Sequence, residues 1–179
     1  MTGRAPGALT LTEGDRRILA EWAADCAERS LPLFAAKAPR DARPRDAIEG
    51  VRRFARGALQ IGPARQLAAL AHAAAREVGD PAAAAAARAA GHAAAVAHMA
   101  AHALGAPAYA ALAAQLARPH DDAAAEELCR WARDHASPVV RRVLRRLPPR
   151  PRSAGALGGL VYRLHTALTS TRASDLVVR

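Results

Sequence analysis

The sequence predicts an all-α protein, a single compact bundle of about seven to nine helices joined by short loops. Alanine supplies most of the apolar residues, which make up 51% of the chain, while aromatic residues make up only 3%. Alanine is the residue that loses least on entering a helix. A capping residue followed by proline, which is a helix-start signal, recurs along the chain. No stretch alternates apolar and polar residues as a half-buried strand does.

The first expected helix begins at Thr12, whose side chain can cap it in a reciprocal box with Asp15. Apolar residues at helical spacing follow: Ile18, Leu19, Trp22 and Cys26. Pro32 has no backbone N–H, so it must break or kink this helix. A second helix is expected over about residues 45–56, with Gly57 at its C-terminal end.

Pro63 is expected to open a third helix. Its buried side would carry Leu67, Leu70, Ala74 and Val78. The pair Asp80-Pro81 is a strong start signal for a fourth helix, which is expected to run to about Leu104. Further helices are expected over about residues 107–117, 121–135, 137–147 and 157–168. Asp121 or Asp122 would cap the second of these.

The helix-start and linker signals divide the chain into three regions. Residues 1–11 are expected to form a loose N-terminus, and residues 12–147 a helical domain. Residues 148–179 would form a linker, a short helix and a basic tail. The linker is marked by three prolines among arginines: Pro148, Pro149 and Pro151.

The charge balance favours an acidic partner. Lysine and arginine number 26 against 16 acidic residues, which gives a formal net charge of +10, and Lys37 is the only lysine. Such a surface attracts nucleic acid, membrane or an acidic protein, although dispersed arginines also fit a basic surface with no dedicated polyanion. Arginine in place of lysine, with abundant alanine, glycine and proline, is typical of a high-GC bacterial genome.

Several function classes find no support in the sequence. Cys26 and Cys129 lie far apart and outside any CxxC pair, which argues against a disulfide scaffold or a zinc knuckle. Neither a secretory signal nor a strongly apolar span is present, so we expect a cytoplasmic protein without a membrane segment. No nucleophile elbow, phosphate-binding loop or dinucleotide fingerprint occurs. We therefore expect no enzyme, no catalytic residue, no metal and no cofactor.

The helix expected over residues 80–104 carries a basic stripe. Its members fall within an arc of about 120° on a helical wheel: Arg88, His92, His98 and His102. His98 and His102 have the i, i+4 spacing that lets two imidazoles share a metal, but no carboxylate between Asp80 and Asp121 could complete the site. A solvated or partner-facing stripe is the preferred interpretation.

The helix that Pro63 opens repeats this design. Arg65, His72 and Arg76 fall within an arc of about 40°. If the two consecutive helices pack antiparallel, the two stripes could line one basic groove. The alternative is two solvated helix faces, because charged residues are exposed by default.

A third basic cluster lies near the C-terminus. It contains Arg141, Arg142, Arg145 and Arg146, followed by Arg150 and Arg152. Like charges at i, i+4 repel one another unless something negative lies between them, so this cluster indicates a polyanion or an acidic partner surface. A solvated basic helix remains the alternative. The lack of interleaved aromatic residues argues against nucleic acid.

Four segments resemble the putative immunity protein family of bacterial polymorphic toxin systems. In chain order they are WAADCAERSLPLF (22–34), RPRDAIEGVRRFARG (43–57), LAALAHAAARE (67–77) and AARAAGHAAAVAHMAAHALGAPAYA (86–110). The spacing of glycine, histidine, arginine and Tyr109 is the informative part. Residues 130–147, WARDHASPVVRRVLRRLP, are more loosely similar to a trailing Trp-containing helix of that family.

The resemblance implies a helical domain that binds and neutralises a cognate toxin protein without catalysing a reaction. The family's histidines and arginines correspond here to His72, Arg76, Arg88, His92, His98 and His102. Because this chain is basic, its toxin should present an acidic surface. The alternative is a nucleic-acid-binding or regulatory helical protein that uses the Arg141–Arg152 cluster. A metal-dependent or small-ligand protein that uses the histidine stripe is a third, weaker hypothesis.

Overall fold

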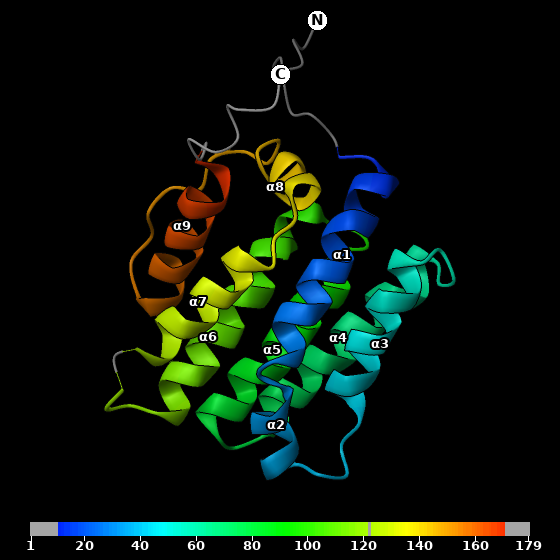
Figure 1. The fold of residues 1–179 in the computed structure, drawn as a ribbon. Helices are drawn as coiled ribbons and strands as arrows, with labels where there is room; N and C mark the ends of the chain where they lie inside the picture. The colour runs from blue at the N-terminus through cyan, green and yellow to red at the C-terminus, as the bar shows by residue number, and fades with distance from the viewer. Residues whose placement is uncertain (1–10, 122, 171–179) are drawn as a thin grey trace, which may run out of the picture.

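The computed structural model describes residues 11–121 and 123–170 and confirms the predicted all-α class (Figure 1). Over these residues it contains nine α-helices, one 3₁₀ helix and no strand. In chain order the elements are α1 (Glu13–Glu28), α2 (Leu31–Lys37), α3 (Arg43–Ala55), α4 (Ile61–Glu77), α5 (Pro81–Ala95), η1 (Ala100–Leu104), α6 (Gly105–Ala117), α7 (Ala124–Asp134), α8 (Pro138–Leu144) and α9 (Ala156–Thr169).

The expectations for residues 1–10 and 171–179 lie outside the described residues, and so does Asp122. The other candidate cap of α7, Asp121, accepts a hydrogen bond from the backbone N–H of Ala123 (3.0 Å), just before α7 begins. None of the helices in the described part of the chain is long and apolar enough to cross a membrane.

Three helix starts lie where the capping residues predict them. Asp15 and Thr12 form the reciprocal box, in which the Asp15 N–H donates to Thr12 Oγ1 (3.1 Å) and the Thr12 N–H donates to Asp15 Oδ2 (2.8 Å). Asp80 and Ser137 each accept the backbone N–H three residues further on, at 2.9 and 3.2 Å. Gly57 ends α3 with a φ of 78°, a backbone conformation that glycine adopts without strain.

The predicted starts at Pro63 and Pro107 are two residues late. The structure begins α4 at Ile61 and α6 at Gly105, and it begins α3 at Arg43 rather than at residue 45. The first-turn N–H groups of a helix have no partner within the helix. A proline therefore fits anywhere in the first turn and does not fix the first residue.

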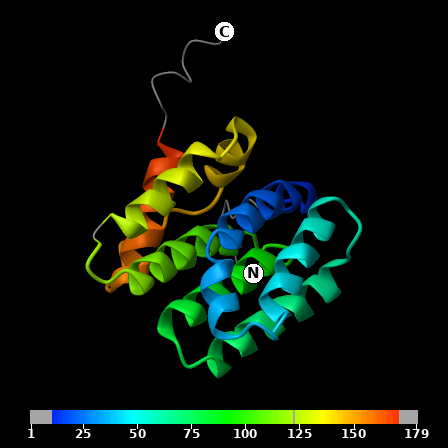
Figure 2. The same cartoon turned by 60° about the horizontal axis from the view of Figure 1, so that its bottom comes forward.

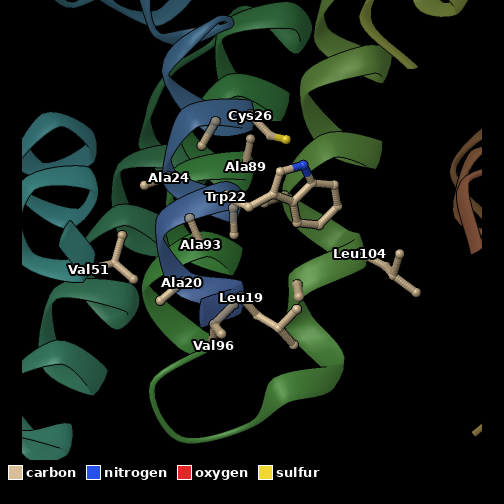
Figure 3. Packing of buried hydrophobic residues seen from close by; sticks show 14 of the residues in the cluster. Leu19, Ala20, Trp22, Ala24, Cys26, Val51, Ala89, Ala93, Val96 and Leu104 are labelled. Carbon is tan, nitrogen blue, oxygen red and sulfur yellow. The ribbon is translucent and has the colours of Figure 1, made fainter. Parts of the chain in front are cut away.

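The centre of the bundle is α5, which packs against α1, α2, α3, α4 and α6. Every alanine of α5 is buried, so this helix contributes mainly methyl groups to the core and neighbouring backbones can approach it closely. Figure 3 shows Trp22 of α1 among Ala89 and Ala93 of α5. The Trp22 indole N–H donates to the carbonyl oxygen of Ala132 (3.0 Å), which ties α1 to the end of α7.

The other helices lie on two sides of α1, α5 and α6. In Figures 1 and 2, α3 and α4 (cyan to green) lie on one side, and α7, α8 and α9 (yellow to red) lie on the other. α9 packs against α6, α7 and α8. Its residues Leu160, Leu164 and Leu168 are buried in the same hydrophobic cluster as α1 and α5.

The predicted buried face of α4 was right at Ala74, which is buried, and wrong at its leucines. Leu70 is 47% exposed and Leu67 only half-buried, whereas Ala64, Ala68 and Ala71 are buried. α4 packs tightly against the alanine surface of α5, and between such close backbones there is room for a methyl group but not for a leucine side chain. The small residues therefore face the core.

The helix predicted to run to Leu104 ends at Ala95 instead. Residues 96–99 form a turn, and η1 follows before α6. Within the turn the carbonyl oxygen of Ala97 accepts a hydrogen bond from Arg16 Nε (2.9 Å) on α1. Val96 is buried on one side of the turn, while His98 and Met99 are exposed on the other.

Candidate functional site

Three histidine rings from three elements meet in one cluster. The ring of His92 (α5) lies between those of His72 (α4) and His102 (η1), with centroid distances of 5.4 and 4.9 Å. Tyr109 of α6 contacts the same ring at 4.8 Å. His98, in the turn after α5, lies 5.6 Å from His102 at the edge of the cluster. The fold thus joins side chains that the sequence placed on two separate stripes.

Two glycines make room for these rings. A Cβ at Gly91 would lie 2.7 Å from Cε1 and 2.8 Å from Nε2 of His72, and a Cβ at Gly105 would overlap Nδ1 of His92. Both distances would be shorter than any normal carbon contact. Neither residue has a positive φ, so glycine is not needed here for its backbone freedom. It is needed because a side chain would prevent the close approach of the rings.

His92 and His102 form a hydrogen-bonded pair. Their Nδ1 atoms lie 3.1 Å apart, so one ring donates its Nδ1–H and the other accepts on an unprotonated Nδ1. This arrangement requires at least one neutral imidazole.

The surroundings of the pair keep both rings neutral. Burial, followed by the nearby His102 and His72, lowers the pKa of His92 from 6.5 to about 3. Burial, followed by His98, His72 and Arg150, lowers the pKa of His102 to about 4. A buried imidazole loses the hydration that stabilises its charged form, and positive neighbours add repulsion.

The same holds for the outer members of the cluster. The pKa of His72 is lowered by burial and then by Arg76 and Arg88. The pKa of His98 is lowered by burial and then by Arg65 and Arg16. Residues 81–120 contain no aspartate or glutamate. The charged neighbours that shift these four pKa values, including those outside this range, are all arginines or other histidines.

The predicted residues thus surround one positive face. Arg65, Arg76 and His98 are exposed, whereas Arg88 and His102 are half-buried. His98 and His102 do not share an α-helix with His92, because α5 ends at Ala95. Within residues 11–121 and 123–170, no group of three or more histidine, cysteine, aspartate or glutamate side chains is placed to hold a metal ion.

The four arginines predicted to face a polyanion have different surroundings. Arg141 is only 8% exposed, and its guanidinium donates to the carbonyl oxygens of Ala136 (3.2 Å) and Arg133 at the end of α7. Arg146 forms an ion pair with Asp15 (2.7 Å). The other two, Arg142 and Arg145, are exposed. The structure thus gives Arg141 a structural role in the α7–α8 junction.

Sequence reasoning missed the placement of Arg150, which it grouped with this C-terminal cluster. Arg150 lies beside the histidine pair, where its guanidinium donates to the carbonyl oxygen of Ala101 (3.3 Å). It lines a pocket of about 320 Å³ together with His92, His102 and Tyr109. No sequence signal placed Arg150 at this site. The glycines in the alanine-rich segment, which weaken a helix unless packing requires them, were a signal only for the close packing of the histidine rings.

Trp131 of α7 marks a second surface that the sequence did not single out. Its half-buried ring stacks on the ring of His135 at 3.9 Å, and the guanidinium of Arg29 lies 4.7 Å from its centre. This contact joins α7 to the end of α1.

Neither cysteine is poised as a nucleophile. Burial raises the pKa of the Cys26 thiol well above 9 and that of Cys129 to about 11. A thiol with so high a pKa stays protonated at neutral pH and reacts slowly. The arrangement of side chains around the histidines offers hydrogen bonds and positive charge to a binding partner.

Comparison with known proteins adds one finding. A family model described as Imm-5 like putative immunity protein matches residues 9–138. The matched segment contains Tyr109 and all four histidines of the cluster, and it ends before Arg141 and Arg150. No curated protein and no solved structure shows significant similarity to the chain.

Proposed function

Since the chain belongs to the Imm-5 like putative immunity protein family, we propose that it binds a cognate toxin protein and neutralises it. In this proposal the protein acts by occupying the toxin, without catalysing a reaction and without a cofactor. It would act in the cytoplasm of the bacterium that carries the toxin.

The proposed toxin-binding surface is the basic face around the histidine cluster. It comprises Arg65, His72, Arg76, Arg88, His92, His98 and His102. The observation that supports it is the lack of any acidic residue over 81–120, together with the charged neighbours that, after burial, lower the pKa values of its four histidines, all of which are arginines or histidines. Glu77 lies next to Arg76, but arginines outnumber carboxylates on this face. Such a face attracts a negative partner surface and repels a positive one.

An apolar group sits within this face. Met99 is 52% exposed in the turn after α5, next to the exposed His98. Interfaces gain most of their binding energy from a few apolar or arginine groups that become buried among polar ones. Methionine is suited to this role because its unbranched side chain adapts to the partner surface.

Affinity purification of the tagged protein from its native host, with nuclease treatment and a high-salt wash, tests the proposal. We expect one co-purifying protein, encoded next to this chain, with a sub-micromolar dissociation constant and an interface of at least about 1,000 Å². Recovery of nucleic acid that is lost with salt, and of no protein, would instead support the nucleic-acid alternative.

A charge reversal locates the surface. Arg65→Glu should weaken toxin binding about tenfold, mostly by slowing association. The matched control is Arg130→Glu, an exposed arginine of α7 outside the proposed surface. Equal losses for the two variants would show that net charge, rather than this face, determines binding.

A further inference from the structure

The pocket beside the histidine pair lies between η1, the start of α6, and α9. Its polar lining includes the side chains of His92, His102 and Arg150. Its walls include the apolar side chains of Leu104, Leu157 and Val161. No aspartate or glutamate lines it, so its only formal charge is the guanidinium of Arg150.

Most N–H donors of the Arg150 guanidinium have no acceptor within the described residues. In the part of the chain that the structure describes, its one hydrogen bond is the long contact to the Ala101 carbonyl oxygen (3.3 Å). A guanidinium has five N–H donors in a planar fork. Arg150 also lowers the pKa of His102 and of His165 on α9, which places it close to both rings.

His165, on α9 near the pocket, carries a second polar group that is not fully used. The residue is only 8% exposed, and its Nε2 atom is buried without a hydrogen-bond partner. It follows Val161 by four residues on α9, one helical turn beyond the pocket wall. Buried polar atoms without partners are rare in folded proteins and call for an explanation.

We infer that this pocket receives an acidic side chain of the protein partner, whose carboxylate binds the Arg150 guanidinium beside the His92–His102 pair. The inference rests on the proposed function, because it names the partner group that enters the basic face. A carboxylate matches the fork of an arginine with two parallel hydrogen bonds. The N–H of a neutral imidazole can donate a third.

The chemistry of the pocket selects this occupant. A metal ion would be repelled by Arg150, and no three ligands of the described chain converge on it. The walls formed by Leu104, Leu157 and Val161 suit the methylene groups that carry a glutamate or aspartate carboxylate. Met99, an exposed apolar residue within the proposed toxin-binding surface, also lines the pocket. The pocket is therefore continuous with that surface.

The pocket also combines two parts of the chain. His92, His102 and Tyr109 lie within the segment that matches the family model, whereas Arg150, Leu157 and Val161 lie beyond residue 138. Arg150 is accordingly a residue by which this chain can select its own partner.

The test uses the full-length protein and the protein that co-purifies with it. We expect Arg150→Gln to weaken binding about 10- to 100-fold, because it removes both the charge and the fork. Arg150→Lys should lie between Arg150→Gln and the wild type, since it keeps only the charge. The control Arg130→Gln should change the affinity less than about threefold. Thermal unfolding of each variant shows whether it is folded.

A double-mutant cycle identifies the partner group. Each acidic residue of the toxin surface is changed to its amide, and each change is combined with Arg150→Gln. One acidic residue should lose its effect when Arg150 is already absent, because two groups in contact are not additive. Arg150→Gln with unchanged affinity, or additivity at every acidic residue, would overturn the pocket assignment while the toxin still bound. If the wild type bound no protein, the proposed function itself would fail.

Discussion

Lowering the pH from 7.5 to 5.0 should destabilise the protein through its histidine pair. In the folded state His92 and His102 have pKa values of about 3 and about 4, below the unperturbed 6.5. Below pH 6.5 the unfolded chain takes up protons at these histidines and the folded protein does not, so unfolding becomes easier. Their contribution to stability is complete above pH 6.5. It falls as the pH drops toward the folded-state pKa values.

The size of the effect follows from the pKa values. Each pH unit below 6.5 costs about 1.4 kcal/mol per histidine that stays neutral in the folded state. Between pH 7.5 and 5.0 this amounts to about 2 kcal/mol per ring. Because His102 is partly open to solvent, we halve the sum for the pair to about 2 kcal/mol. For a chain of this length the melting temperature should fall by about 4–8 °C.

Thermal unfolding followed by circular dichroism at constant ionic strength measures the fall. The variant His102→Asn keeps a polar group near the Nδ1 position but cannot titrate, so it should lose the share of the pH dependence that His102 contributes. The control His120→Asn, at an exposed position, should behave as the wild type does. Stability equal at pH 5.0 and 7.5, or an unchanged fall in His102→Asn, would refute the reasoning. Work below pH 5 is avoided because carboxylates of the unfolded chain then begin to protonate. Glu28 and Asp41, whose pKa values are lowered in the folded protein by hydrogen bonds from Arg52 and Arg43, would add their own pH dependence there.

Three further predictions concern the core. Gly91→Ala should lower the melting temperature by several degrees because its methyl group meets the neighbouring imidazole, whereas Gly62→Ala, with no atom within 4 Å, should be neutral or slightly stabilising. Trp22→Phe should lower the free energy of unfolding in urea by about 1–3 kcal/mol, since it leaves the Ala132 carbonyl without its donor; a smaller loss would mean that water replaces the indole. Cys26 is fully buried, so a thiol reagent should modify it only when urea unfolds the chain; rapid labelling in native buffer would contradict its placement.

Local signals predicted the parts of the fold that local contacts determine. The caps at Thr12, Asp80 and Ser137 each use a side chain and a backbone N–H three residues away. Such a pattern is complete within a few residues of sequence. The all-α class was equally accessible, because alanine content and the lack of alternation act along the whole chain.

The end of α5 could not be predicted in this way. The segment from Ala93 to Ala103 is rich in strong helix formers, and a helix through it agrees with propensity. The hydrogen bond from Arg16 to the Ala97 carbonyl, however, comes from a helix 81 residues earlier in the chain. Positions where tertiary contacts override a strong local preference are often functional ones. This turn carries the exposed Met99 of the proposed toxin-binding surface.

The candidate site was predictable in its members but not in its geometry. A helical wheel gathers histidines by their angle around one helix, and it cannot show that His72 and His92 pack ring against ring. Their meeting depends on the missing side chains of Gly91 and Gly105. Arg150 joins the cluster only because the chain returns to η1 after α8. Whether these residues bind a partner stays a prediction.

The alanine surface of α5 has a consequence for partner choice. An alanine side chain has no rotamers, so the alanines of α5 have no alternative side-chain arrangement when a partner binds to the surface that they support. A surface supported in this way would keep its shape when a toxin binds. A toxin that does not match it would then gain no binding energy from a rearrangement of the surface. Discrimination between related toxins would then depend on the rigidity of the scaffold as much as on the groups that it displays.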